Sequence, residues 1–128
     1  MQVESLSAIT LATHDMTKAL AFYEVLGFRT VWAAPDGSFA TINAGRAWVN
    51  IFRAEPDAEW GAWGRFVLHV DDVDAFHERL IAAGYQPQMA PSDAPWGERY
   101  FHILDPDGHE VSLAKRFRPV ETNVETQD

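Results

Sequence analysis

Residues 8–28 read AITLATHDMTKALAFYEVLGF, and residues 65–85 read RFVLHVDDVDAFHERLIAAGY. Each stretch begins with an alternating run typical of a β-strand, followed by an aspartate suited to the N-cap of a helix. Apolar residues then recur at helical spacing until a glycine predicts the helix end. Asp15 and Asp72 are 57 residues apart, the closing glycines repeat this offset, and the alignment has no gap. The two stretches therefore indicate a duplicated strand–helix unit.

A strand–turn–strand pattern follows each unit. Residues 39–52 place a turn at 43–45, and residues 101–114 place one at 105–108, where the sequence DPDG suits a type I turn. These segments match at an offset of 62 residues, five more than the offset of 57 between the strand–helix units. The five additional residues fall in the Pro-rich stretch 86–96, which predicts a loop. Each half is thus predicted to be β-α-β-β-β, and its second strand has the weakest pattern.

The predicted fold class is α+β, with two β-α-β-β-β repeats in one chain. A chain of 128 residues, 47% of them hydrophobic, is long enough to bury the core of one domain. We expect a single domain over 1–128, with repeats at 6–53 and 64–115, a linker at 54–63 and a polar tail at 119–128.

The composition excludes several classes of function. The formal net charge is −9, and such an acidic domain lacks the basic face that nucleic acids and anionic membranes require. The absence of cysteine excludes disulfide scaffolds, thiolate metal sites and cysteine nucleophiles. No leader-like segment and no apolar run of about 20 residues is visible, so we expect a cytoplasmic protein with no membrane or nucleic-acid partner.

Three sequence motifs lie on the duplicated frame. They are ALAFYEVLGF at 19–28, VDDV at 70–73, and PWGER at 95–99 followed by DPDGH at 105–109. Over residues 6–115 the chain resembles the vicinal oxygen chelate superfamily, which includes glyoxalase I, extradiol dioxygenases and bleomycin-resistance proteins. The resemblance implies curved sheets that enclose a cavity, and it implies a homodimer.

The resemblance also identifies four positions at which the superfamily's enzymes hold a divalent metal through His or Glu. In this sequence these positions are Ala8, Asn50, Arg65 and Ser112. Arginine is permanently cationic and cannot coordinate a metal, and the Asn and Ser oxygens are weak neutral ligands. We therefore expect no metal and no cofactor, as in the bleomycin-resistance branch.

Two kinds of enzyme site stay open as alternatives. Strand alternation places Glu110 on the face of Ser112 and His69 on the face of Arg65, and the resemblance turns Tyr100 and His102 into the cavity. A displaced metal site would then be formed by His69, His102 and Glu110. A metal-free site would use His102 with Tyr100 for acid–base catalysis.

The aromatic residues and Arg65 point to a ligand cavity. Trp48 and Trp96 are candidates for stacking on a planar ligand, and Trp60 and Trp63 of the linker are weaker ones. Arg65 needs a partner, which is either Glu110 or an anionic or carbonyl group of the ligand. The predicted ligand-binding residues are Trp48, Asn50, Arg65, His69, Trp96, Tyr100, His102, Glu110 and Ser112.

Two function hypotheses result. The first is metal-free binding of a small organic molecule, with sequestration of an antibiotic as the specific version that the resemblance implies. The second is a lyase or oxygenase that uses one of the alternative sites. The remaining histidines have no assigned role: we expect His77 on the polar face of its helix and His109 in solvent at the start of a strand.

Overall fold

The computed structural model describes residues 1–118, so the polar tail predicted at 119–128 lies outside the described residues. The described chain forms two compact units, one made of residues 1–63 and 105–109, the other of residues 64–104 and 110–118. The 105–109 turn of the second predicted repeat thus belongs to the first unit, and the single domain stays a prediction. None of the helices in the described chain has the length and apolar character needed to cross a membrane.

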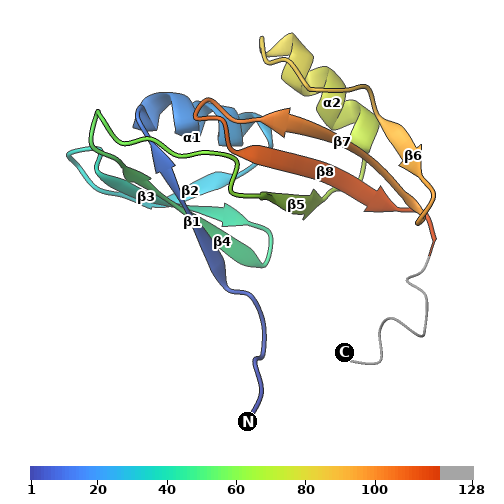
Figure 1. Cartoon of the computed structure of the whole chain (residues 1–128), viewed down its shortest axis with the longest axis horizontal. Coiled ribbons are helices and arrows are strands. Elements are labelled where there is room, and N and C mark those ends of the chain that lie inside the picture. Colours follow the sequence, from blue (N-terminus) through green and yellow to red (C-terminus); the bar gives the residue numbers. More distant parts are fainter. Residues whose placement is uncertain (119–128) are drawn as a thin grey trace. The chain divides into compact units, whose positions relative to one another are not determined.

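The first unit contains one helix and a four-stranded sheet (Figure 1). Its elements are β1 (Ala8–Thr13), α1 (Met16–Val25), β2 (Arg29–Ala33), β3 (Phe39–Ala44) and β4 (Ala47–Arg53). The strand order is β1-β4-β3-β2, with β1 parallel to β4 and the other neighbours antiparallel. The hairpin between β3 and β4 turns at Gly45 and Arg46, two residues later than the predicted start of the turn, and Gly45 has a φ of 64°.

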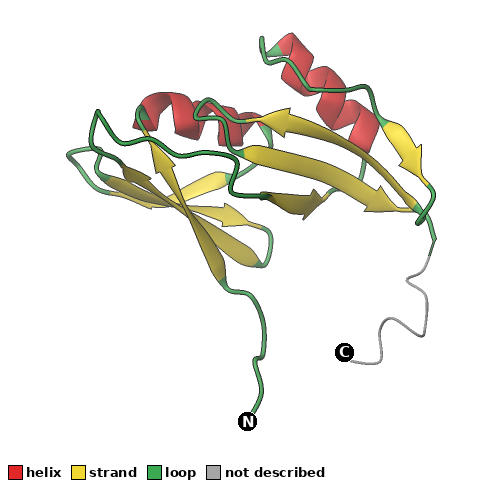
Figure 2. Ribbon diagram, in the orientation of Figure 1, coloured by secondary structure: helices red, strands yellow, loops and turns green. Residues whose placement is uncertain are grey.

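The second unit repeats this order of elements (Figure 2). They are β5 (Arg65–His69), α2 (Val73–Ala82), β6 (Ser92–Ala94), β7 (Glu98–Leu104) and β8 (Glu110–Arg116). The strand order β5-β8-β7-β6 has the same parallel and antiparallel pairings as the first sheet. The predicted loop at 86–96 is wrong in part, because β6 lies inside it and pairs with β7. The α+β fold of two β-α-β-β-β repeats is confirmed.

Both helices begin and end where the repeat predicts. The Asp15 carboxylate accepts from the backbone N–H of Lys18 at 3.1 Å, and the Asp72 carboxylate caps α2 in the same way at 3.0 Å. After α1, Gly27 has a φ of 89°, and the N–H of Phe28 donates to the carbonyl of Tyr23. This left-handed conformation is accessible to glycine at little cost, so a glycine here ends the helix.

Each sheet buries the face that its helix covers. The apolar residues buried in the first unit include Phe22, Tyr23, Ala40, Ile42, Val49 and Ile51. Those in the second unit include Val73, Leu80, Phe101, Ile103, Val111 and Leu113. A large apolar side chain contributes about 1.5–3 kcal/mol when fully buried. Because side chains alternate along a strand, the other face of each sheet carries a separate set of residues, and the candidate site lies there.

Candidate functional site

The second sheet gathers most of the predicted site residues on the face opposite α2. Strand pairing sets Arg65 of β5 beside Glu110 of β8, and Ser112 of β8 beside His102 of β7. We call this surface the second-sheet face. Its polar and aromatic members are Arg65, His69, Glu98, Tyr100, His102, Glu110 and Ser112.

Arg65 has a partner within the protein. Its Nε donates to Oε1 of Glu110 at 2.8 Å, and its Nη1 lies 3.5 Å from Nε2 of His102. The side chains of Arg65 and Glu110 are 49% and 26% exposed. Of the two partners expected for Arg65, the structure therefore supplies Glu110, and the guanidinium still reaches the surface, where a ligand could contact it.

His102 of β7 contacts side chains from β8 and β5. Its Nδ1 lies 2.5 Å from Oγ of Ser112. Burial and the nearby Arg65 cation lower the pKa of His102, and the Glu110 carboxylate opposes this shift. With Nε2 facing the Arg65 donor, the consistent arrangement has the proton on Nδ1, donating to Ser112.

A row of rings continues from His102 along the same face. The centroids of Tyr100 and His102 are 5.1 Å apart, and those of Tyr100 and Trp96 are 6.0 Å apart with near-parallel planes. The indole N–H of Trp96 donates to Glu98 at 3.1 Å, which fixes the ring although it is 61% exposed. The planes of Trp96 and Tyr100 are 28° apart and those of Tyr100 and His102 are 49° apart, so the row offers several ring faces beside the Arg65–Glu110 pair, and a planar group of a ligand can stack on one of them.

Two predicted residues lie in the other unit, on the exposed face of the first sheet. The Asn50 carbonyl accepts from Oγ1 of Thr41 at 2.8 Å, and its amide donates to Oγ1 of Thr10 at 3.5 Å. Trp48, on the same strand, is 40% exposed. Both groups of the Asn50 amide thus have partners within the sheet, so its contacts are those of a structural residue.

The prediction for His109 is wrong. It is only 3% exposed, its Nδ1 accepts from the Trp63 indole at 2.7 Å, and its Nε2 donates to the carbonyl of Ala12 at 2.8 Å. Trp60 stacks on the same imidazole with centroids 5.6 Å apart. The sequence showed a polar residue after a tight turn, and nothing local indicated that partners from 46 and 97 residues away bury it.

Sequence reasoning also missed a buried carboxylate in the first unit. Asp105 accepts from the Tyr23 hydroxyl at 2.7 Å and from the backbone N–H groups of Asp107 and His109. Burial raises the pKa of Asp105, and these hydrogen bonds oppose the shift. Burial and the neighbouring Asp105 raise the pKa of Tyr23 well above its ordinary value. This network anchors the DPDG turn and takes no part in the second-sheet face.

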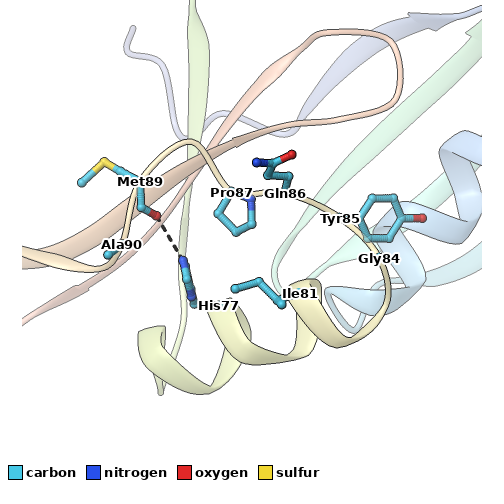
Figure 3. Close-up of a pocket in the computed structure, with 8 residues that line it drawn as sticks. All are labelled: His77, Ile81, Gly84, Tyr85, Gln86, Pro87, Met89 and Ala90. Carbon is cyan, nitrogen blue, oxygen red and sulfur yellow. Dashed lines mark hydrogen bonds between the residues drawn. The ribbon is translucent and has the colours of Figure 1, made fainter.

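A hollow of about 540 Å³ lies between α2 and residues 84–90 of the second unit (Figure 3). His77 borders it, donating from Nε2 to the carbonyl of Met89 at 3.1 Å and meeting Phe101 edge-on at 4.9 Å. His77 therefore faces the sheet, and the prediction that it lies on the polar face of its helix is wrong. The hollow is lined mainly by apolar side chains and contains none of the predicted site residues.

Comparison with known proteins agrees with this architecture. The family model described as "Glyoxalase/Bleomycin resistance protein/Dioxygenase superfamily" matches residues 5–113. The chain belongs to this superfamily. Three proteins show the range of similarity to the chain in sequence and in structure.

A bleomycin resistance protein from Klebsiella pneumoniae is 29% identical over 106 residues, which cover 77% of this chain and 82% of the relative. An uncharacterised protein from Mycobacterium bovis is 43% identical over 53 residues, covering 41% of this chain and 35% of that protein. The chain thus matches about a third of the length of the mycobacterial relative. A crystal structure of a bleomycin-binding protein complexed with bleomycin has 25% identity and a TM-score of 0.67, covering 88% of this chain and 99% of the other.

The donors at the superfamily's usual metal positions do not fit a divalent cation. Ala8 offers no donor, and Arg65 brings a positive charge that is already paired with Glu110. The displaced set is not assembled either: His69 contacts Glu98 at 3.3 Å, whereas His102 and Glu110 adjoin Arg65. Within residues 1–118, no group of three or more His, Asp or Glu side chains is placed to hold a metal ion.

Proposed function

We propose that this protein binds an organic molecule that carries a planar aromatic group on the second-sheet face without a metal, and that it sequesters the molecule unchanged. The observation that carries the proposal is the row formed by Trp96, Tyr100 and His102 beside the Arg65–Glu110 pair. The sequence similarity to a bleomycin resistance protein supports an antibiotic of the bleomycin class as the first ligand to test.

The row provides the apolar part of the binding energy. A ligand ring that covers the exposed face of Trp96 or Tyr100 gains burial of apolar area and stacking, the latter worth about 0.5–1.5 kcal/mol per aromatic pair. The rings are held by hydrogen bonds and by one another, so little side-chain entropy is lost when a ligand binds.

The ion pair provides orientation. Its contacts use Nε and Nη1 of Arg65, and the third guanidinium nitrogen can donate to a carbonyl or carboxylate oxygen of the ligand. Because Glu110 neutralises Arg65 locally, the face selects a ligand by its shape and its dipolar groups more than by its net charge.

A second candidate function rests on His102. Its lowered pKa keeps the imidazole neutral near pH 7, and it adjoins Tyr100, so the pair could act as a general base and acid on a bound ligand. The chemical identity of the ligand released from the protein distinguishes binding from catalysis. Sequestration returns the ligand unaltered, and catalysis returns a product.

The test is calorimetric titration of the purified protein with bleomycin, followed by mass spectrometry of the ligand recovered after denaturation. We expect saturable binding, and Trp96→Ala should weaken it at least tenfold, because a central stacking tryptophan is a typical binding hot spot. Trp32→Ala is the matched control, since Trp32 is exposed on β2 of the first unit. A modified ligand would favour the enzyme, and equal affinity of the two variants would refute the second-sheet face.

A homodimer and a cytoplasmic location stay predictions. Sedimentation equilibrium over a hundredfold range of protein concentration measures the first, and fractionation of cells that express the protein measures the second. Neither is needed for the binding proposal.

A further inference from the structure

We propose a second binding site in the first unit, where the linker tryptophans cover the edge of β1, for a flat uncharged aromatic molecule of one or two rings. The site is a hollow of about 260 Å³. It is bounded by residues 9–12 of β1, Phe52 of β4, Trp60, Trp63 and His109. It shares no residue with the second-sheet face, so it is independent of the function proposed above.

The rings that form its walls are fixed before any ligand arrives. Trp60 lies between two imidazoles, with its centroid 4.7 Å from that of His14 and 5.6 Å from that of His109, and both pairs are nearly parallel. Its indole N–H donates to the carbonyl of Asp107 at 3.0 Å. Trp63 is held by its hydrogen bond to His109. A ligand that enters this hollow loses little free energy to ordering the protein.

The walls offer apolar surface and few polar contacts. Both indole N–H groups and both nitrogens of His109 are engaged with partners inside the unit. The Thr10 hydroxyl already accepts from Asn50. A charged group of a ligand that lies against these walls would find no polar group there to pair with. Trp63 is nevertheless 50% exposed, so its apolar surface remains for a flat ring to cover.

The volume sets the size of the ligand. A cavity of about 150 Å³ lined by apolar side chains accepts benzene, and pockets for drug-sized molecules measure about 300–1,000 Å³. The hollow lies between these limits at about 260 Å³. A fused two-ring molecule such as indole therefore matches both its size and its chemistry.

The experiment titrates unlabelled indole into the ¹⁵N-labelled protein and follows the signals of the five tryptophan indole N–H groups. We expect saturable shifts of Trp60 and Trp63 with a Kd on the order of 0.1–1 mM, as for a ligand of about ten heavy atoms. The Trp32 signal should not move. Indole-3-acetate, which carries a charge, should bind at least tenfold more weakly.

Two variants test the location. Trp63→Ala removes a half-exposed wall and should weaken indole binding at least tenfold, whereas Trp32→Ala should leave it unchanged. Ala12→Leu fills the hollow from β1 and should block binding even if Trp63→Ala rearranges the linker. Absence of saturable shifts, or unchanged affinity in both hollow variants, would overturn the site.

The Trp60 and Trp63 signals could instead move with protein concentration but not with indole. That result would also overturn the proposal and would assign this surface to a contact with a second copy of the chain. Bleomycin should bind Trp63→Ala as it binds the unchanged protein, because the second-sheet face does not include Trp63. The two binding proposals can therefore fail independently.

Discussion

Replacing Tyr23 with phenylalanine removes one hydrogen bond from a buried carboxylate and leaves the apolar ring in place. The Tyr23 hydroxyl donates to Oδ2 of Asp105 at 2.7 Å, and both residues lie almost entirely out of solvent. A hydrogen bond to a charged group contributes about 1.5–3 kcal/mol, and no water can reach the vacated position easily. We expect Tyr23→Phe to lower the free energy of unfolding by about 2 kcal/mol at pH 7, with Tm falling by about 6–10 °C.

The contribution of Asp105 to stability depends on pH. Because the pKa of Asp105 is raised in the folded protein, this group contributes most to stability below its unfolded pKa, and the contribution is lost as the pH rises through the folded pKa. The Tyr23 hydrogen bond opposes the raised pKa, so its loss enlarges the cost of the carboxylate at neutral pH.

Urea unfolding at pH 4 and pH 7 measures both effects. Tyr23→Phe should destabilise the protein more at pH 7 than at pH 4. Tyr100→Phe, which removes a hydroxyl from the exposed sheet face, is the control and should change stability by less than about 0.5 kcal/mol. An equal loss at both pH values, or a loss below about 0.5 kcal/mol at pH 7, would refute the reasoning.

Three further predictions follow from single contacts. Burial and the Arg65 cation lower the pKa of His102, so Arg65→Met, which removes the cation, should raise this pKa in an NMR titration of the His102 ring; a lower value would contradict the arrangement. Asp72→Ala removes the N-cap of α2 and should lower the free energy of unfolding, measured in urea, by about 1 kcal/mol. Asp72→Ser keeps a capping oxygen and should therefore retain most of the wild-type stability. Arg99→Ala breaks exposed ion pairs to two aspartates, so its small effect on Tm at low salt should vanish in about 1 M NaCl.

The parts of the structure that depend on local sequence could be predicted well. Asp15 and Asp72 cap helices through N–H groups three residues away, so the cap and the repeat were visible in the sequence itself. The sequence predicts Glu110 as one of two possible partners of Arg65, because strand alternation and the duplicated frame place both residues on one face, and the structure shows this pair. The repeat predicts a second strand in each half, but the position of β6 is not visible in the sequence, since three residues without an apolar pattern become a strand only by pairing with β7.

The misses concern residues whose surroundings come from far along the chain. His109 follows a turn glycine, a position that favours solvent, yet Trp63 and Ala12 bury it. The sequence makes the linker tryptophans weaker ligand candidates, but no local pattern indicates that Trp60 lies between two histidines. Such clusters depend on how distant segments meet, which composition and periodicity do not specify.

The central claim is that the aromatic row of the second-sheet face holds the ligand. Trp96 reports on it directly, because its indole N–H donates to Glu98 within that face. The most direct measurement is a titration of the ¹⁵N-labelled protein with bleomycin, followed through the tryptophan indole signals. We predict a saturable shift of the Trp96 signal, with the Trp32 signal unchanged. Saturable bleomycin binding that leaves the Trp96 signal in place would contradict the account.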